Sequence, residues 1–422
     1  MTVKPALIGV ARLFSGWTPP ALAAVCAAVP WYGTSAPSAV AALTWIGGVC
    51  AVLLLVRAAA RGLRQSGALR ERVLVIGDGP LIDKLIDELT HARQQDYLVV
   101  GVIDGHRAAS RVLAGASGEE AVHRIDRLIA ETQPARIVIA LGGRRGRLPE
   151  QPFLDCRLRG IAVEEAVAFY ERVTGKIAIE ALTPRALILS DGFRHSDFVP
   201  SDFSMAVSRA VSFVCAGLGL IGLAPLMTLI AVAVKLETPG PVFFSQDRVG
   251  RGGRPFRLVK FRTMRQGIGA HSEWVRDNTD RITRVGTWLR RFRCDELPQF
   301  LNVLRGDMNL VGPRPHPVTN YSLFLSQIPY YRIRGAVRPG ITGWAQIRYG
   351  YANTLEEETE KMRYDLYYIK HRSLRLDVQI LLQTVGVLLL DRRSHEAVRT
   401  TAVAAETERR ALAERRATAR TA

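Results

Sequence analysis

The fold class follows from nine consecutive residues, Arg72-Val73-Leu74-Val75-Ile76-Gly77-Asp78-Gly79-Pro80. Their branched apolar run predicts a buried β-strand, and the glycines after it predict a tight turn into a helix over residues 81–89. Apolar runs at residues 97–103 and 136–140 predict two more strands, with a helical stretch around residues 123–131 between them. Strands that alternate with helices predict a Rossmann-like parallel α/β sheet.

The glycine turn matches the dinucleotide-binding pattern G-x-G-x-x-G only in part. The third glycine would fall at Ile82, whereas Asp104 lies at about the right distance to contact a ribose. Two interpretations stay open: a working nucleotide site, and a Rossmann-like, CoA-binding-like domain that packs and docks without a cofactor. The missing glycine favours the second interpretation.

Two long uncharged segments lie on either side of this region, and the first is residues 13–56. It is long enough for two membrane crossings of ~20 residues each, with a turn at residues 30–37. Basic residues on both flanks place both ends in the cytoplasm by the positive-inside rule. The sequence therefore predicts a transmembrane helical hairpin within residues 1–70, and a buried hairpin of a soluble domain is the alternative.

The second uncharged segment, residues 210–234, contains one proline. Pro225 has no N–H, and its ring clashes with the carbonyl of Ile221, so a helix kinks or breaks there. Arg209 precedes the segment and Lys235 follows it. Two basic ends favour a re-entrant helix that enters and leaves by the same membrane face. A straight crossing is the alternative.

The chain as a whole is strongly basic. Lys and Arg number 57 against 39 Asp and Glu in 422 residues, so the net charge is +18, while 48% of the residues are hydrophobic. The apolar fraction excludes a chain that is disordered throughout. The charge suits either nucleic acid or an anionic membrane with phosphorylated ligands, and a recognisable nucleic-acid-binding motif is missing from the sequence. Five scattered Cys without a C-x-x-C pair predict neither a disulfide framework nor a zinc site.

Clusters of cations beside Gly and Pro lie between residues 235 and 373. They are Lys260-Phe261-Arg262-Thr263-Met264, Arg290-Arg291-Phe292-Arg293-Cys294-Asp295-Glu296-Leu297-Pro298-Gln299, Gly312-Pro313-Arg314-Pro315 and Arg338-Pro339-Gly340-Ile341-Thr342-Gly343. Such clusters suit phosphate, because Arg offers a planar fork and Lys a point charge. The carboxylates of Asp295 and Glu296 among these cations are candidates to hold Mg²⁺, or for one of them to attack a phosphoryl group.

Several polar residues have simpler explanations. Asp295 is also placed to cap a helix over residues 297–304. Residues 374–390 predict a helix that lies on the membrane surface. His316 has no partner that the sequence identifies. The residues expected to be membrane-surface charges are Arg248, Arg251 and Arg254, and those expected to form a solvated helix face are Glu356, Glu357, Glu358 and Glu360.

Residues 235–391 resemble the catalytic domain of the bacterial sugar transferases that prime exopolysaccharide synthesis, the polyprenyl-phosphate hexose-1-phosphate transferases. The resemblance rests on the clusters above together with Pro239-Gly240-Pro241-Val242-Phe243-Phe244 and Gly306-Asp307-Met308. With the α/β region and the N-terminal membrane helices, it covers most of the chain in the long form of this monotopic phosphoglycosyl transferase family. Residues 349–358 most resemble the members that accompany exosortase-type export systems.

The resemblance implies an undecaprenyl-phosphate sugar phosphotransferase on the cytoplasmic face of the bacterial inner membrane. Asp295 matches the nucleophile, which takes the hexose 1-phosphate of a UDP-hexose as a covalent intermediate, releases UMP and then gives the sugar phosphate to undecaprenyl phosphate. Glu296 matches the partner acid that, with Asp295, holds Mg²⁺. Arg290 and Arg314 match phosphate-binding arginines, and Lys260 lies in a motif that lines the same site. The predicted substrate-binding residues are Lys260, Arg262, Arg290, Arg314 and Arg338.

The implied organisation is an α/β membrane protein in four parts. Membrane helices occupy residues 1–70, a Rossmann-like domain 71–190, an α-rich catalytic domain 191–391 with its membrane helix at 210–234, and a charged tail 392–422. A homodimer is compatible with the resemblance, and downstream glycosyltransferases would use the lipid-linked product. The rival function is a non-catalytic, membrane-tethered α/β module that senses nucleotides, as the partial glycine motif indicates.

Overall fold

The computed structural model describes residues 48, 70–77, 79–91, 96–103, 126–140, 150–189, 193, 203–265, 281–350, 352 and 354–390. The predicted N-terminal hairpin, the charged tail, Asp78 and Asp104 lie outside these residues. Internal contacts divide the chain into two units, Met1–Tyr170 and Glu171–Ala422.

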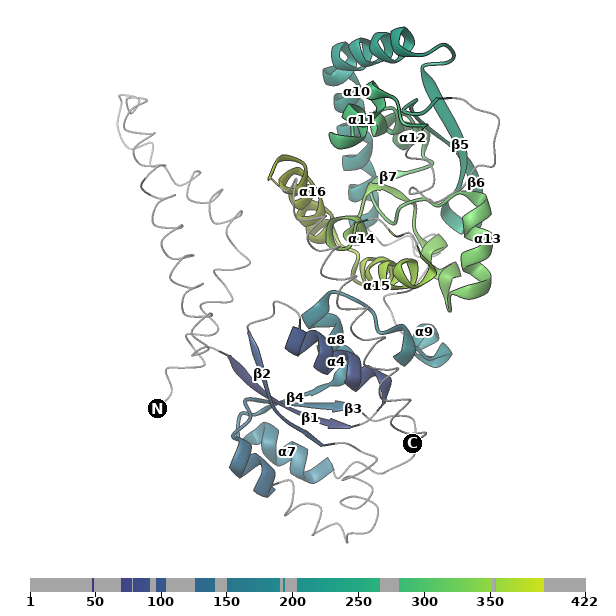
Figure 1. Ribbon diagram of the computed structural model, residues 1–422. Helices are drawn as coiled ribbons and strands as arrows, with labels where there is room; N and C mark the ends of the chain where they lie inside the picture. Colours follow the sequence, from purple (N-terminus) through teal and green to yellow (C-terminus); the bar gives the residue numbers. More distant parts are fainter. Residues whose placement is uncertain are drawn as a thin grey trace, which may run out of the picture. The chain divides into compact units, whose positions relative to one another are not determined.

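The first unit is built on a four-stranded parallel sheet in the order β2-β1-β3-β4. Its elements are β1 (Glu71–Gly77), α4 (Pro80–His91), β2 (Tyr97–Ile103), β3 (Arg136–Ala140), α7 (Glu150–Leu158), β4 (Ala162–Glu165) and the start of α8 (Ala166–Thr174). Helices α4 and α7 cover opposite faces of the sheet (Figure 1). The central strands β1 and β3 are buried, which explains their continuous apolar residues, and the predicted parallel α/β sheet is confirmed.

Packing explains the partial glycine motif of this sheet. A Cβ on Gly77, where φ is +139°, would lie 2.2 Å from the carbonyl oxygen of Ala140 on the neighbouring strand. Ile82, at the position of the missing third glycine, is only 3% exposed in α4. The first glycine thus permits the close approach of two strands, and the third position belongs to the hydrophobic core.

The second unit begins inside α8, before the apolar helix at residues 203–237. Ile177 and Ile179 are buried in one cluster with Trp344 and Met362. The indole Nε1 of Trp344 also donates to the carbonyl of Gly175 at 2.8 Å. Residues from 175 on therefore share a core with the second unit, while the boundary of the Rossmann-like domain at residue 190 stays a prediction.

The rest of the second unit combines helices with short paired strands. Its elements are η2 (Ile179–Ala181), α9 (Pro184–Leu189), α10 (Phe203–Glu237), β5 (Phe243–Val249), η4 (Arg251–Gly253), β6 (Pro255–Phe261), α11 (Arg284–Arg291), η6 (Cys294–Glu296), α12 (Gln299–Arg305), β7 (Asn309–Val311), α13 (Val318–Gln327), η7 (Tyr331–Ala336), β8 (Gly340–Thr342), α14 (Trp344–Arg348), α15 (Leu355–His371) and α16 (Leu374–Leu390). Strands β5 and β6 pair antiparallel, and β7 and β8 pair parallel.

Helix α10 is the apolar helix that the sequence predicts. Within the described residues it holds the one candidate membrane span, Ala206–Glu237, and only 11% of its most apolar window is buried. It contains Pro225, and Figure 1 shows it bent into two segments. Thr228 Oγ1 donates to the carbonyl of Ala224 at 2.9 Å, a bond of the kind that often accompanies a helix bend.

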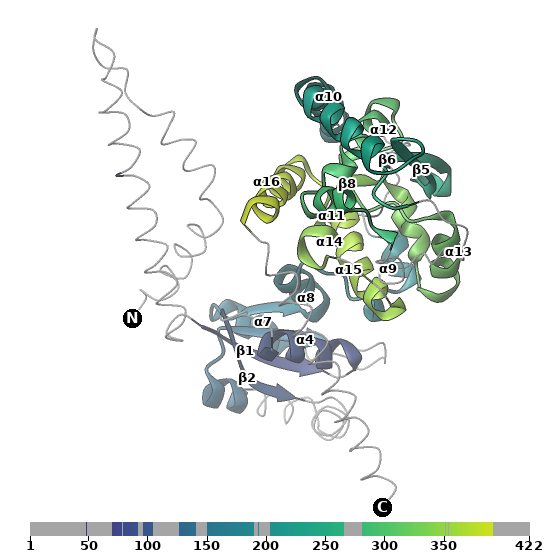
Figure 2. The same ribbon diagram turned by 45° about the horizontal axis from the view of Figure 1, so that its top comes forward.

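Two arginines attach both ends of α10 to the same body of the second unit. Near its start, Arg209 donates to the carbonyls of Met308 at 2.7 Å and Val303 at 3.0 Å. Near its end, Arg262, the residue after β6, donates to the carbonyls of Pro239 at 2.8 Å and Thr238 at 2.6 Å. Helix α10 also lies against α12 (Figures 1 and 2). A straight helix of 35 residues would separate its ends by about 50 Å, and the bend shortens this separation.

Helix α16 is fixed to α10 by a buried carboxylate. Asp377 accepts hydrogen bonds from Ser208 Oγ of α10 and, at 2.8 Å, from the Tyr368 hydroxyl of α15. On its other side α16 exposes an apolar stripe at helical spacing, formed by Leu374, Val378, Leu382 and Val385. This stripe has the form expected of a helix on a membrane surface.

Candidate functional site

The two adjacent carboxylates lie in η6, a single 3₁₀ turn between α11 and α12. Arg293 before the turn adopts φ +53°, a left-handed conformation that costs a non-glycine residue roughly 1 kcal/mol. Helix α12 begins only at Gln299, with Pro298 as its N-cap. The alternative that Asp295 caps this helix is therefore wrong, because the proline starts the helix and leaves Asp295 in the turn before it.

Glu296 is buried and paired with Arg314. Its Oε1 accepts from Arg314 Nη2 at 2.7 Å, and its side chain is 8% exposed. Burial alone would raise the pKa of Glu296, but Arg314 and Arg293 outweigh it and hold that pKa below its usual value. Glu296 is thus kept ionised, and its negative charge pairs with cations.

Asp295 has the opposite behaviour. Burial, followed by the charge of Glu296, raises the pKa of Asp295, while Lys260, Arg314 and Arg290 oppose the rise. The structure therefore gathers three predicted phosphate-binding residues, from β6, α11 and the Gly312–Pro315 segment, around the two predicted acids. A carboxylate pair whose pKa values are pushed apart is typical of sites that carry out chemistry.

Lys260 and Arg290 are positioned by neighbouring side chains. The Lys260 ammonium lies 5.2 Å from the ring centroid of Phe244, and Arg290 Nε donates to Thr263 Oγ1 at 3.0 Å. Burial, reinforced by Arg248 and opposed by Asp295, lowers the pKa of Lys260 to about 8. The charge of Lys260 therefore changes within the range of ordinary assays.

Two other arginines that were predicted to bind the substrate, Arg262 and Arg338, donate hydrogen bonds to backbone carbonyls. Arg262 is 4% exposed, and its guanidinium donates to the carbonyls of Thr238 and Pro239 directly after α10. Arg338 Nε donates to the carbonyl of Gly306 at 3.1 Å, at the C-terminal cap of α12. The structure thus places both arginines in bonds that fix elements of the second unit, and their predicted contact with the donor stays a prediction.

Arg248, expected from the sequence to be a membrane-surface charge, is bonded within the second unit, and its position at a membrane stays a prediction. Its Nη1 donates to the carbonyl of Pro315 at 2.8 Å, and its charge contributes to the lowered pKa of Lys260. Its place on β5, paired with the strand of Lys260, brings it to the site. The sequence motif around Lys260 could not predict that β5, which carries Arg248, pairs with the strand of Lys260.

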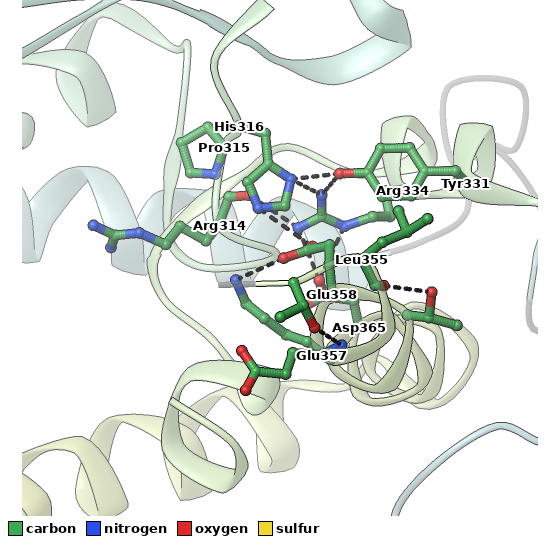
Figure 3. A network of polar contacts seen from close by, with 12 residues as sticks. Arg314, Pro315, His316, Tyr331, Arg334, Leu355, Glu357, Glu358 and Asp365 are labelled. Carbon is green, nitrogen blue, oxygen red and sulfur yellow. Dashed lines mark hydrogen bonds and ion pairs between the residues drawn. The ribbon is translucent and has the colours of Figure 1, made fainter. Parts of the chain in front are cut away.

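A buried polar network lies behind the Gly312–Pro315 segment (Figure 3). Arg334 pairs with Asp365 of α15 at 2.8 Å, and its Nη1 donates to His316 Nδ1 at 2.5 Å. His316 Nε2 faces Glu358 Oε1 at 3.3 Å. Burial, with Arg334 and Lys361 nearby, holds the pKa of His316 well below its usual range, so the imidazole is neutral.

The sequence interpretation of Glu358 is therefore wrong, and the structure supplies the partners of His316 that the sequence did not identify. Glu358 is 2% exposed, whereas it was expected on a solvated face. It lies four and eight residues before Met362 and Leu366, which are both fully buried. This spacing of a buried helix face could have identified Glu358, but its partner His316 is distant in sequence.

The acidic pair fits the ligand set of a substrate-bound Mg²⁺. Proteins commonly hold this ion by one or two carboxylates together with substrate phosphates and water. Among the residues that the structure describes, no group of three or more His, Cys, Asp or Glu is placed to hold a metal by itself. Asp295 and Glu296 would therefore hold the ion together with a phosphorylated ligand. The bound ion would supply positive charge to neutralise a diphosphate.

The second unit is similar to known proteins. The family described as "Bacterial sugar transferase" matches residues 203–391. A UDP-glucose:undecaprenyl-phosphate glucose-1-phosphate transferase of Caulobacter vibrioides is 46% identical over 184 residues, which are 43% of this chain and 69% of that protein. The chain belongs to the bacterial sugar transferase family.

Longer matches extend this likeness to other sugar transferases. A UDP-N-acetylgalactosamine-undecaprenyl-phosphate N-acetylgalactosaminephosphotransferase of Aeromonas hydrophila is 42% identical over 235 residues, 56% of this chain and 54% of that protein. An undecaprenyl-phosphate glucose phosphotransferase of Komagataeibacter xylinus is 30% identical over 367 residues, 81% of this chain and 64% of that protein. The chain thus spans about half the length of the Aeromonas sugar transferase.

Proposed function

We propose that this chain transfers a hexose 1-phosphate from a UDP-sugar to undecaprenyl phosphate, the priming step of exopolysaccharide synthesis. The observation that carries the proposal is the Asp295–Glu296 pair surrounded by Lys260, Arg290 and Arg314. Phosphoryl transfer depends mainly on positioning and charge neutralisation, and this cluster offers both. Downstream glycosyltransferases would then extend the lipid-linked sugar.

The chemistry proceeds in two displacements at one phosphorus atom. A carboxylate oxygen of Asp295 attacks the β-phosphorus of the UDP-sugar, and the bond from that phosphorus to the bridging oxygen breaks, so UMP leaves with the electron pair. A phosphate oxygen of undecaprenyl phosphate then attacks the same phosphorus. The bond between this phosphorus and the Asp295 oxygen breaks, which gives undecaprenyl-diphosphate-sugar and the free Asp295 carboxylate.

A UMP-release screen tests this function. The full chain in nanodiscs, given Mg²⁺, undecaprenyl phosphate and a panel of UDP-hexoses and UDP-N-acetylhexosamines, should release UMP with at least one donor. Omission of the lipid should limit release to about one UMP per enzyme. If no donor gives UMP while the residues 70–190 bind a nucleotide tightly, the rival function of a nucleotide sensor is favoured.

The pH profile should reveal Lys260. Its ammonium supplies positive charge below a pKa of about 8, so kcat/KM for the UDP-sugar should fall as the pH rises through that value. Lys260→Arg keeps its charge and should remove this alkaline limb. Lys235→Arg, at an exposed lysine, is the matched control and should retain it. An alkaline limb that survives in Lys260→Arg would contradict the assignment.

We further propose that α10 is re-entrant and that the catalytic unit lies on the cytoplasmic face of the inner membrane. The attachment of both α10 ends to one body supports this arrangement. His195→Cys and Arg410→Cys, each in a background without the five native cysteines, should react with membrane-impermeant reagents from the same, cytoplasmic side. Labelling from opposite sides would favour a straight crossing.

A further inference from the structure

The backbone that carries Arg314 is held through its carbonyl groups. Prolines on both sides of Arg314 provide no N–H donors and restrict the segment to extended conformations. At one end, the carbonyl of Pro313 accepts from the N–H of Gly340 at 3.0 Å. At the other end, the carbonyl of His316 accepts from the N–H of Val249 at 2.9 Å.

The two carbonyls between these anchors are held by arginine side chains. Arg334 Nη2 donates to the carbonyl of Arg314 itself at 3.0 Å. Arg248 Nη1 donates to the carbonyl of Pro315 at 2.8 Å. Guanidinium groups therefore anchor the residue whose own side chain pairs with Glu296 at 2.7 Å.

Arg334 is itself fixed on several sides. Its side chain is 5% exposed and pairs with Asp365, whose Oδ2 lies 2.9 Å from Nε and 2.8 Å from Nη2. Its Nη1 donates to the hydroxyl of Tyr331 and to His316 Nδ1, each at 2.5 Å. Figure 3 shows the Arg314 side chain pointing away from this network, so Arg334 contacts the backbone of Arg314 and not its guanidinium.

We propose that Arg334 is a positioning residue for the transfer reaction, which holds the backbone of Arg314 so that the Arg314 side chain stays on Glu296 and reaches the donor diphosphate. This inference rests on the proposed function. The planar guanidinium is required, because one group bonds Asp365 on one side and the Arg314 carbonyl on another. An ammonium in its place keeps the charge but lacks the fork that makes these bonds together.

A double-mutant cycle with Arg314 tests the inference. Arg334→Lys should lower kcat/KM for the UDP-sugar by about 10- to 100-fold, as displacement of a positioned group does elsewhere. In an Arg314→Lys background, the same change should cost less than about threefold, because the side chain that it positions is already altered.

Arg363→Lys is the matched control. Arg363 is also a buried arginine, 4% exposed, and its partners Glu180 and Glu360 belong to neither the Gly312–Pro315 segment nor the acidic turn η6. Its change should lower kcat/KM by the same factor in both backgrounds. If Arg334→Lys does not fold, Arg248→Lys is expected to give the same dependence on Arg314 through the Pro315 carbonyl.

Each outcome has a distinct meaning. Losses from Arg334→Lys or Arg248→Lys that vanish in the Arg314→Lys background, beside a constant effect of Arg363→Lys, support the positioning role. Equal losses in both backgrounds in an active enzyme would overturn this inference and leave the proposed function intact. A wild-type chain that releases no UMP with any donor would overturn both.

Discussion

Asp295→Asn should abolish UMP release by the full chain, with a loss of at least about 10³-fold in kcat, since removal of a nucleophile removes the covalent route. The amide keeps the size of the carboxylate but cannot attack phosphorus. The pKa of Asp295 is raised by burial and by Glu296, so wild-type activity should also fall on the acid side at a higher pH than an ordinary aspartate would give.

Mass spectrometry provides the direct measurement. Wild-type chain incubated with donor and Mg²⁺, without lipid, should carry a hexose-phosphate adduct on the peptide that contains Asp295, and Asp295→Asn should carry none. Asp247→Asn, the same change at an exposed residue of β5, should keep activity within about twofold. Adducts found elsewhere, or kinetics that require both substrates before UMP appears, would contradict a covalent Asp295 intermediate.

The second large effect concerns stability. Ile177→Ala should destabilise the second unit by about 2–5 kcal/mol, the usual cost of truncating a buried isoleucine. Ile177 is 1% exposed and packs in the cluster of Met362 and Leu366. Its N–H also donates to the carbonyl of Arg363 at 3.0 Å. The apparent Tm of the chain in nanodiscs should fall by on the order of 10 °C.

Ile188→Ala provides the control within the same part of the chain. Ile188 lies in α9 and is 81% exposed, so its truncation should change stability by no more than about 0.5 kcal/mol. Similar Tm shifts for the two variants would show that residues 175–189 do not share the core of the second unit. A shift confined to Ile177→Ala would show that they do.

The fold was predictable where a local pattern determines the element. Strands β2 and β3 match the apolar runs at residues 97–103 and 136–140. For the buried strand β3 the reason is that a buried parallel strand requires continuous apolar residues. The proline inside α10 was also predictable from the sequence. The cluster around Asp295 was predictable as well, because its motifs contain the carboxylates and the cations that meet there.

The burial of Glu358 and the hydrogen bonds of Arg262 and Arg338 could not be predicted, because their partners are distant in the sequence. Whether a glutamate is solvated or buried depends on the group that faces it, and for Glu358 that group is His316. Arg262 and Arg338 donate hydrogen bonds to carbonyls of residues distant in the sequence. The motifs that contain these arginines therefore could not predict these partners. Such long-range pairs decide which cations face Asp295.

The attachment of both ends of α10 has a consequence for biogenesis. If the helix is re-entrant as proposed, the domain after it is never carried across the bilayer, and its insertion needs no translocation of charged residues. Arg209 of α10 binds a carbonyl of the folded unit, and Arg262 of that unit binds the carbonyl of Thr238 directly after α10. A re-entrant α10 could therefore reach its final depth only as that unit forms. Membrane insertion and folding of the cytoplasmic domain would then be a single cooperative event.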